Sequence, residues 1–121
     1  MRPVSAYMLT FNNARTIERA LASVAFVDEL VVVDSGSTDG TLEIVRAATD
    51  RVIERQWPGF REQYQFAQNQ CTHDWVLFLD ADEEISPSLA NEIQTLFSGV
   101  AEDDSVRGYN VRRRTFFLGR W

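Results

Sequence analysis

Two apolar runs in this sequence each end in an aspartate. Asp34 follows the valine run 31–33, and Asp80 follows the run 75–79. In open sheets of parallel strands, ligands bind beyond the carboxyl ends of the strands. If both runs are strands of one such sheet, Asp34 and Asp80 face a common crevice. We therefore predict a ligand site built from strand ends.

A cluster of carboxylates begins at the second of these aspartates and reads Asp-Ala-Asp-Glu-Glu over residues 80–84. On an extended segment, Asp80 and Asp82 project to the same side. Mg²⁺ and Mn²⁺ prefer one or two carboxylates together with phosphate oxygens. We expect this pair to hold a divalent cation that neutralises a diphosphate. The plainer alternative is that the acids cap the next helix and solvate a loop, and Glu83 and Glu84 fit either interpretation.

Three other polar segments accompany these acids. Residues 10–13, Thr-Phe-Asn-Asn, follow the first apolar run and either hydrogen-bond a nucleobase or only make a turn. Asp39 stands where a helix cap belongs, with ligand contact as the alternative. The arginines 112–114 suit phosphate, but neighbours on a strand point to opposite faces, so a solvated edge strand is the favoured interpretation.

The elements that position these residues follow from the apolar pattern. Strands are predicted over 4–10, 30–34, 51–55 and 75–79, with a further extended segment over 107–117. Four helices are predicted between and after them, with these inward residues: Ile17, Ala20, Leu21 and Val24; Leu42, Val45 and Ala48; Phe60, Tyr64, Ala67 and Cys71; Leu89, Ile93 and Leu96. This alternation predicts an α/β fold, a mainly parallel sheet flanked by helices, in one domain over 1–121.

Helix starts also carry signals. Asn12 or Asn13 is predicted to cap the first helix, and Thr38 or Asp39 the second. Ser86 followed by proline predicts the start of the last helix.

Composition excludes some classes of function. The formal net charge is −6, which argues against a nucleic-acid partner because phosphate backbones are bound by clustered cations. The single cysteine excludes an internal disulfide and a cysteine metal cluster. We see no signal peptide and no apolar run of about 20 residues that would span a membrane. We therefore expect a cytoplasmic protein.

The order of these motifs resembles family 2 glycosyltransferases of the GT-A fold, which is Rossmann-like. The segments that carry the resemblance are Thr10-Phe11-Asn12, Val31 through Asp34-Ser-Gly-Ser-Thr-Asp39-Gly-Thr41, and Trp75 through Asp80-Ala-Asp82-Glu83. The stretch from Gly59-Phe60 to Asp74-Trp75 and the ending Phe117-Leu-Gly-Arg-Trp121 look most like the bacterial lipopolysaccharide-core glucosyltransferase branch. Each motif alone is weak, and their order and spacing together are specific.

The resemblance implies an inverting transferase that takes a sugar from a nucleotide-diphospho-sugar such as a UDP-sugar. It implies that the Thr10 region, with Asn12, and Asp34 hold the nucleobase, and that Asp80 contacts the ribose or the diphosphate. Asp82 would then bind the divalent metal, Mn²⁺ or Mg²⁺. The acceptor would be a glycan or a lipid-linked glycan of the cell envelope, with peripheral association at the inner face of the membrane.

Two departures from the family pattern accompany this resemblance. Tyr64, after Gln63, stands where related sequences usually carry a cation. The family's acceptor segment and catalytic base fall beyond Trp121, so the chain is expected to be the donor-binding portion of a longer protein. A non-catalytic module that binds nucleotide diphosphates is one alternative. A nucleotidyltransferase is another, although residues 10–15 lack the usual Gly-rich basic loop.

Overall fold

The structure is a computed structural model that describes residues 2–98 together with Gly108 and Tyr109. Within these residues, four parallel strands form one sheet in the order β3-β2-β1-β4. The strands are β1 (Val4–Thr10), β2 (Glu29–Asp34), β3 (Arg51–Glu54) and β4 (Trp75–Phe78). The helices are α1 (Ile17–Ser23), α2 (Thr41–Ala48), α3 (Phe60–Asn69) and α4 (Pro87–Ser98). The predicted α/β fold with a parallel sheet is confirmed.

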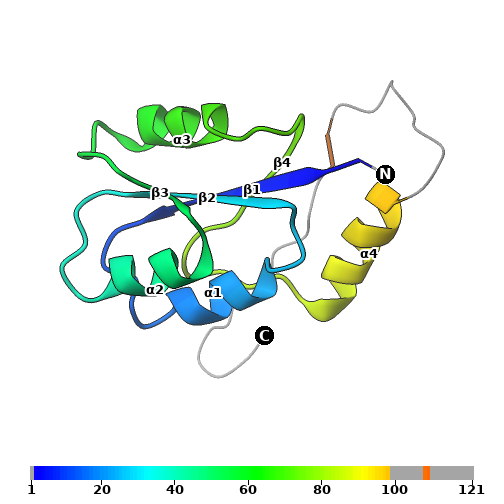
Figure 1. Cartoon of the computed structure of the whole chain (residues 1–121), viewed down its shortest axis with the longest axis horizontal. Coiled ribbons are helices and arrows are strands. Elements are labelled where there is room, and N and C mark those ends of the chain that lie inside the picture. The colour runs from blue at the N-terminus through cyan, green and yellow to red at the C-terminus, as the bar shows by residue number, and fades with distance from the viewer. Residues whose placement is uncertain (1, 99–107, 110–121) are drawn as a thin grey trace.

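Helices cover both faces of the sheet (Figure 1). α1 and α2 lie on one face and α3 lies on the other. Alternation along β1 and β2 explains this layering, because successive side chains of a strand point to opposite faces. Met8 and Val32 pack toward α1 and α2, whereas Tyr7, Val31 and Val33 pack toward α3. A strand buried on both faces reads as a continuous apolar run, as these valines do.

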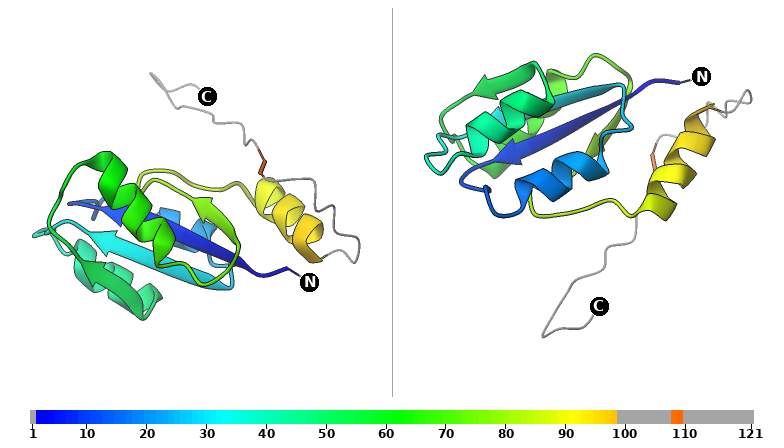
Figure 2. Two further views of the ribbon diagram at one scale, coloured as in Figure 1. Left: turned by 90° about the horizontal axis from the view of Figure 1, so that it is seen from above. Right: turned by 60° about the horizontal axis from the view of Figure 1, so that its bottom comes forward.

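The last helix departs in part from its predicted inward face. α4 lies at the side of the sheet, next to the N-terminal end of the chain (Figure 2). Phe97 is its buried residue, whereas the predicted Leu96 is exposed. Phe97 packs against Trp75 and under the guanidinium of Arg2, whose backbone N–H also donates to the Phe97 carbonyl. This contact with the start of the chain, which periodicity alone does not encode, sets the helix rotation.

The helix starts were predicted with mixed success. Ser86 is confirmed, because its hydroxyl accepts the Leu89 N–H at 3.1 Å. For α1, the cap position is occupied by Thr16 rather than by Asn12 or Asn13. Asn13 instead accepts the N–H groups of residues 16 and 17 through its backbone carbonyl, so the helix begins one turn later than the asparagines suggested.

One further prediction is wrong, and another concerns residues that lie mostly outside the described part of the chain. Ala48, predicted to face inward, is exposed at the end of α2. The predicted extended segment 107–117 lies outside the described residues apart from Gly108 and Tyr109, and the arginines 112–114 and the ending 117–121 lie wholly outside them. Within the described part of the chain, no helix has both the length and the apolar character needed to cross a membrane.

Candidate donor site at the carboxyl edge of the sheet

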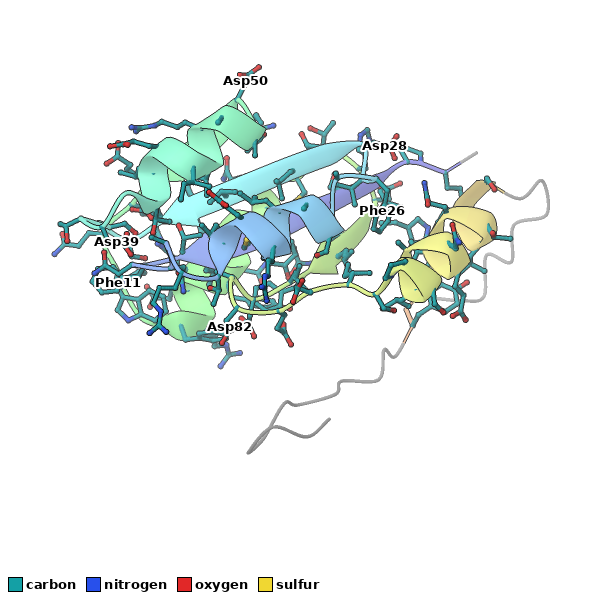
Figure 3. The ribbon with its side chains drawn as sticks, turned by 90° about the horizontal axis from the view of Figure 1, so that it is seen from below. Phe11, Phe26, Asp28, Asp39, Asp50 and Asp82 are labelled. Atoms are coloured by element: carbon teal, nitrogen blue, oxygen red, sulfur yellow. The ribbon has the colours of Figure 1, made fainter. Side chains whose placement is uncertain are left out.

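The ends of the strands meet at one edge of the sheet, as parallel strands require. The register pairs Thr10 of β1 with Asp34 of β2, and Asp34 with Glu54 of β3. β4 runs parallel on the other side of β1, so the residues after it emerge at the same edge. Figure 3 shows Asp39 and Phe11 at this end of the molecule, with Asp28 and Phe26 at the other. The predicted meeting of the strand ends is therefore present.

Asp34 is fully buried and builds the loop that follows β2 (residues 35–40, the β2-exit loop). Its Oδ1 accepts the hydroxyls of Thr10 and Ser37, each at 2.6 Å. Its Oδ2 accepts the backbone N–H groups of Gly36 at 2.9 Å and Ser37 at 2.8 Å. A carboxylate has about four lone-pair sites, and all of them accept a proton donor here. A direct contact between Asp34 and a nucleobase stays a prediction.

The same contacts set the ionisation of Asp34. Burial alone raises the pKa of this carboxyl group, because it disfavours the charged form. The hydrogen bonds from Ser37, from Thr10 and from the two backbone groups outweigh burial, so the pKa is held below its ordinary value. Asp34 is therefore a buried carboxylate that remains charged at neutral pH.

The segment after β1 is joined to the β2-exit loop by reciprocal hydrogen bonds. The Asn12 side-chain oxygen accepts the Thr38 N–H at 2.8 Å, and the Asn12 N–H donates to the Ser37 hydroxyl at 2.8 Å. Asn12 has a φ of 54°, a left-handed conformation that asparagine tolerates better than most residues. Its side chain is exposed at the edge of the sheet. Asn12 thus joins two loops and also remains accessible.

Asp39 ties the same two loops together from the start of α2. Its Oδ1 accepts the hydroxyl of Thr41 at 2.6 Å and the Thr41 N–H at 3.1 Å, and its Oδ2 accepts the Ala14 N–H at 3.1 Å. The Thr41 hydroxyl, with the other hydrogen bonds, holds the pKa of Asp39 below its ordinary value. Gly40 occupies the cap position with a φ of 97°. Asp39 therefore stabilises the helix start from one residue earlier.

The cluster of carboxylates after β4 adopts a tight turn, which corrects the prediction of an extended segment. The Glu83 N–H donates to the Asp80 carbonyl at 2.9 Å, which closes a four-residue turn over 80–83 (the acidic turn). The Asp80 N–H donates to the Glu83 carboxylate at 2.9 Å. Ala81 is buried and Asp82 is exposed. The turn, and not strand alternation, therefore sets the directions of the Asp80 and Asp82 side chains.

The described residues do not form a ready metal cage, since no three Asp, Glu, His or Cys side chains among them converge. Mg²⁺ is usually bound by one or two carboxylates together with substrate phosphates and water. The acidic turn offers half-buried Asp80 and exposed Asp82, which fits a cation that arrives with a diphosphate. These two carboxylates therefore suit the predicted metal.

Gln63 is a buried polar residue at this edge that the sequence analysis did not assign. Its Nε2 donates to the Ser35 hydroxyl at 3.2 Å and to the Arg55 carbonyl at 3.1 Å. Its Oε1 accepts the Arg55 guanidinium at 2.6 Å, and that guanidinium also stacks on the ring of Phe66. Gln63 thereby ties α3 to the β2-exit loop. In the sequence, only its position four residues before the buried Ala67 pointed inward.

Tyr64, the residue that departs from the family pattern, packs against the sheet. Its ring lies 5.2 Å from that of Tyr7 and 4.7 Å from that of Phe78. Phe60, which was also predicted to face inward, is exposed and contacts exposed Trp57. Tyr64 therefore supplies an aromatic contact to the core at this position.

A surface pocket of about 570 Å³ lies at the opposite edge of the sheet. It is lined by the end of α1, the end of α2 and the starts of β2 and β3, including Asp28, Leu30 and Asp50. None of the predicted site residues lines it. We place the candidate site at the carboxyl edge because the strand-end acids and loops that bind ligands in such sheets lie there.

Comparison with known proteins identifies the family. Residues 5–117 match the model of glycosyl transferase family 2. The chain belongs to this family. That membership confirms the resemblance read from the motif order, and the parallel sheet agrees with the GT-A fold of solved relatives.

Two curated relatives illustrate the similarity. An uncharacterized glycosyltransferase of Rickettsia felis is 43% identical over 104 residues, which cover 85% of this chain and 37% of the relative. The lipopolysaccharide core biosynthesis glycosyltransferase LpsC of Rhizobium meliloti is 34% identical over 122 residues, which cover 97% of this chain and 44% of LpsC. This family 2 chain thus spans less than half the length of either relative.

A solved structure extends the comparison to bound ligands. Glucosyl-3-phosphoglycerate synthase from Mycobacterium tuberculosis in complex with UDP has a TM-score of 0.63 and 30% identity, and the match covers 82% of this chain and 41% of the synthase. Another crystal structure of that synthase contains Mn²⁺, UDP-glucose and phosphoglyceric acid, with a TM-score of 0.59 and 29% identity over 69% of this chain and 35% of the synthase.

Proposed function

We propose that this protein binds a nucleotide-diphospho-sugar, of which a UDP-sugar is the favoured form, at the carboxyl edge of its sheet. The observation that carries the proposal is the exposed Asp82 on a tight turn, at the same edge as the loop organised by buried Asp34. The UDP and UDP-glucose complexes of the related mycobacterial synthase support this choice of ligand. The reaction is glycosyl transfer with inversion to a glycan or lipid-linked acceptor, and similarity to LpsC supports a role in lipopolysaccharide synthesis.

The nucleoside end is assigned to the β1 and β2 exits. Thr10 and Asp34 are buried, so they shape this end by fixing the β2-exit loop. Asn12 is exposed, and its side-chain nitrogen has no partner among the described residues, so it is the group best placed to donate to a base carbonyl. Backbone groups of the β2-exit loop complete this end of the site.

The diphosphate end is assigned to the acidic turn. Asp82 is the proposed metal ligand, and Asp80 is the proposed contact for the ribose or for the metal-bound diphosphate. A bound Mn²⁺ or Mg²⁺ would offset the repulsion between these acids and the diphosphate and stabilise the leaving group as its charge develops. The cytoplasmic location and the peripheral association with a membrane stay predictions.

The experiment is a calorimetric titration of UDP into the protein with and without Mn²⁺. Wild type is expected to bind UDP more tightly with manganese, and Asp82→Ala is expected to lose that gain while remaining folded. Asp50→Ala is the matched control, because Asp50 is an exposed aspartate at the opposite edge of the sheet. Equal manganese-dependent binding by wild type and Asp82→Ala would falsify the metal-ligand assignment. Sugar transfer in the same protein separates an enzyme from a binding module.

A further inference from the structure

Thr16 occupies the cap position of α1, yet its side chain does not cap that helix. The usual cap hydrogen bond, from a backbone N–H two or three residues on to the threonine oxygen, is not made. The hydroxyl donates instead to the carbonyl of Ala81 at 2.9 Å, across 65 residues of sequence. The Thr16 hydroxyl therefore makes a hydrogen bond to the acidic turn in place of the usual cap hydrogen bond to its own helix.

The hydroxyl of Thr16 has one proton and two acceptors within reach. The Asn13 carbonyl lies 3.5 Å away and the Ala81 carbonyl 2.9 Å away. Hydroxyl hydrogen bonds fall between about 2.5 and 3.0 Å, so the proton belongs to the contact with Ala81. The direction of this hydrogen bond is therefore set, because the carbonyl can only accept.

Ala81 is the residue between the two acids that we assign to the diphosphate end. Its side chain is buried against the core under α1 and α2, with 5% exposure. Fixing its carbonyl fixes the peptide plane that joins Ala81 to Asp82. The hydrogen bonds between Asp80 and Glu83 lie within the turn, whereas the bond from Thr16 ties the turn to another element.

The segment that carries Thr16 is itself held by the β2-exit side of the site. The Asn13 N–H donates to the Thr41 hydroxyl at 2.9 Å, and the Ala14 N–H donates to Asp39 at 3.1 Å. The Thr16 N–H then donates to the Asn13 carbonyl at 3.0 Å. A continuous series of hydrogen bonds thus runs from the start of α2, through residues 13–16, to the acidic turn.

We propose that Thr16 is a positioning residue for the metal-binding turn: its hydroxyl fixes the Ala81 carbonyl, and so orients Asp82 relative to the nucleoside end of the site. The inference rests on the proposed function, because it concerns the same diphosphate end. Outer partners that orient metal ligands typically alter metal affinity by 10- to 100-fold when removed. Thr16 acts in this way through a backbone carbonyl without touching the metal.

The test compares Thr16→Val with Thr16→Ser in the full chain. The quantity measured is the manganese gain, the ratio of the Kd for UDP without Mn²⁺ to the Kd with Mn²⁺. Thr16→Val keeps the side-chain shape and lacks the hydroxyl, so its gain is expected to fall roughly tenfold, with unchanged metal-free affinity. Thr16→Ser retains the hydroxyl and is expected to restore the gain. Thr16→Ala is a second hydroxyl-free variant that adds no strain at the site.

Thr49→Val is the control for loss of a threonine hydroxyl away from the site, because the Thr49 hydroxyl donates to the Leu30 carbonyl at 2.7 Å and accepts the Arg51 N–H at 3.1 Å, both at the opposite edge of the sheet. Its thermal midpoint is expected to fall at least as far as that of Thr16→Val, because the Arg51 N–H also loses its acceptor, while its manganese gain stays at the wild-type value. A wild-type gain in both Thr16→Val and Thr16→Ala would overturn the positioning role and leave the proposed function standing. Absence of any manganese gain in wild type would overturn the proposed function, and this inference with it.

Discussion

The β2-exit loop and the acidic turn lie at the same edge of the sheet and use aspartate in opposite ways. Asp34 has no exposed surface and accepts four hydrogen bonds from three residues. Asp82 is exposed at the tip of its turn. A carboxylate whose lone pairs are all occupied organises protein, whereas an exposed one stays available to a cation. Under the proposed function, this difference corresponds to a site that is pre-built at the nucleoside end and completed by its ligand at the diphosphate end.

The largest effect is expected from removing the organising carboxylate. Asp34→Ala leaves two hydroxyls and two backbone N–H groups without their acceptor, and is expected to cost about 3 kcal/mol of unfolding free energy in urea denaturation. Asp34→Asn is expected to lose less than half as much. Its amide oxygen can face the two N–H groups, and the hydroxyls of Thr10 and Ser37 can turn to accept from its nitrogen. An alanine variant as stable as wild type would remove the distinction between the two aspartates.

The pH dependence sharpens the same point. The pKa of Asp34 is lower in the folded protein than in the unfolded chain, so its contribution to stability is present above the unfolded value of about 3.9 and is lost as the pH falls through the lower folded value. Asp34→Asn does not titrate there. Urea denaturation between pH 5 and pH 3, a range chosen to bracket that value of about 3.9, should therefore show a shallower loss of stability in Asp34→Asn than in wild type.

A smaller effect is expected at Gln63, which holds the β2-exit loop from the side of α3. Gln63→Leu keeps the volume but removes the acceptor for Arg55 and the donor to Ser35, at an expected cost of about 2 kcal/mol. UDP affinity should fall with it, because the loop loses a support. Gln65→Leu is the control, since Gln65 lies exposed on the same helix and bonds only to Asn69 among the described residues. Equal stability of both variants would show that α3 does not support the loop.

Much of the fold could be predicted because burial on both faces leaves a strong pattern. The predicted first strand has the observed bounds, and Ile17, Ala20, Leu21 and Val24 are all buried. The errors occur where a particular contact overrides the signal carried by residue type and spacing. Leu96 is exposed because Phe97 packs against distant Arg2 and Trp75. The start of α1 has a local cause, because Asn13 accepts the N–H groups of residues 16 and 17 through its backbone carbonyl and not through its side chain.

The sequence predicted where the site lies better than it predicted how the side chains and loops of the site are arranged. Strand ends place Asp34 and Asp80 at one edge because parallel strands run the same way. The sequence does not reveal that every lone-pair site of Asp34 accepts a hydrogen bond, since the donors come from the end of β1 and from the β2-exit loop. It also does not separate a turn from an extended segment at 80–83, because that depends on the hydrogen bond from Glu83 to Asp80. Gln63 was missed because a glutamine on a helix usually faces solvent.

The smallest change in stability is expected for substitution of Asp82. This substitution tests most directly whether the acidic turn and the β2-exit loop use aspartate in different ways. Asp82→Asn alters an exposed side chain beside other acids, so its unfolding free energy should stay within about 0.5 kcal/mol of wild type. Its manganese gain for UDP should nevertheless be lost, because the amide lacks the negative charge of the carboxylates through which such cations are bound beside substrate phosphates. Binding and stability would thus separate in the acidic turn, whereas they fall together in the β2-exit loop. A loss above about 1 kcal/mol, beyond what exposed positions normally show, would mean that Asp82 organises its turn as Asp34 organises its loop, and the two ends of the site would then be built alike.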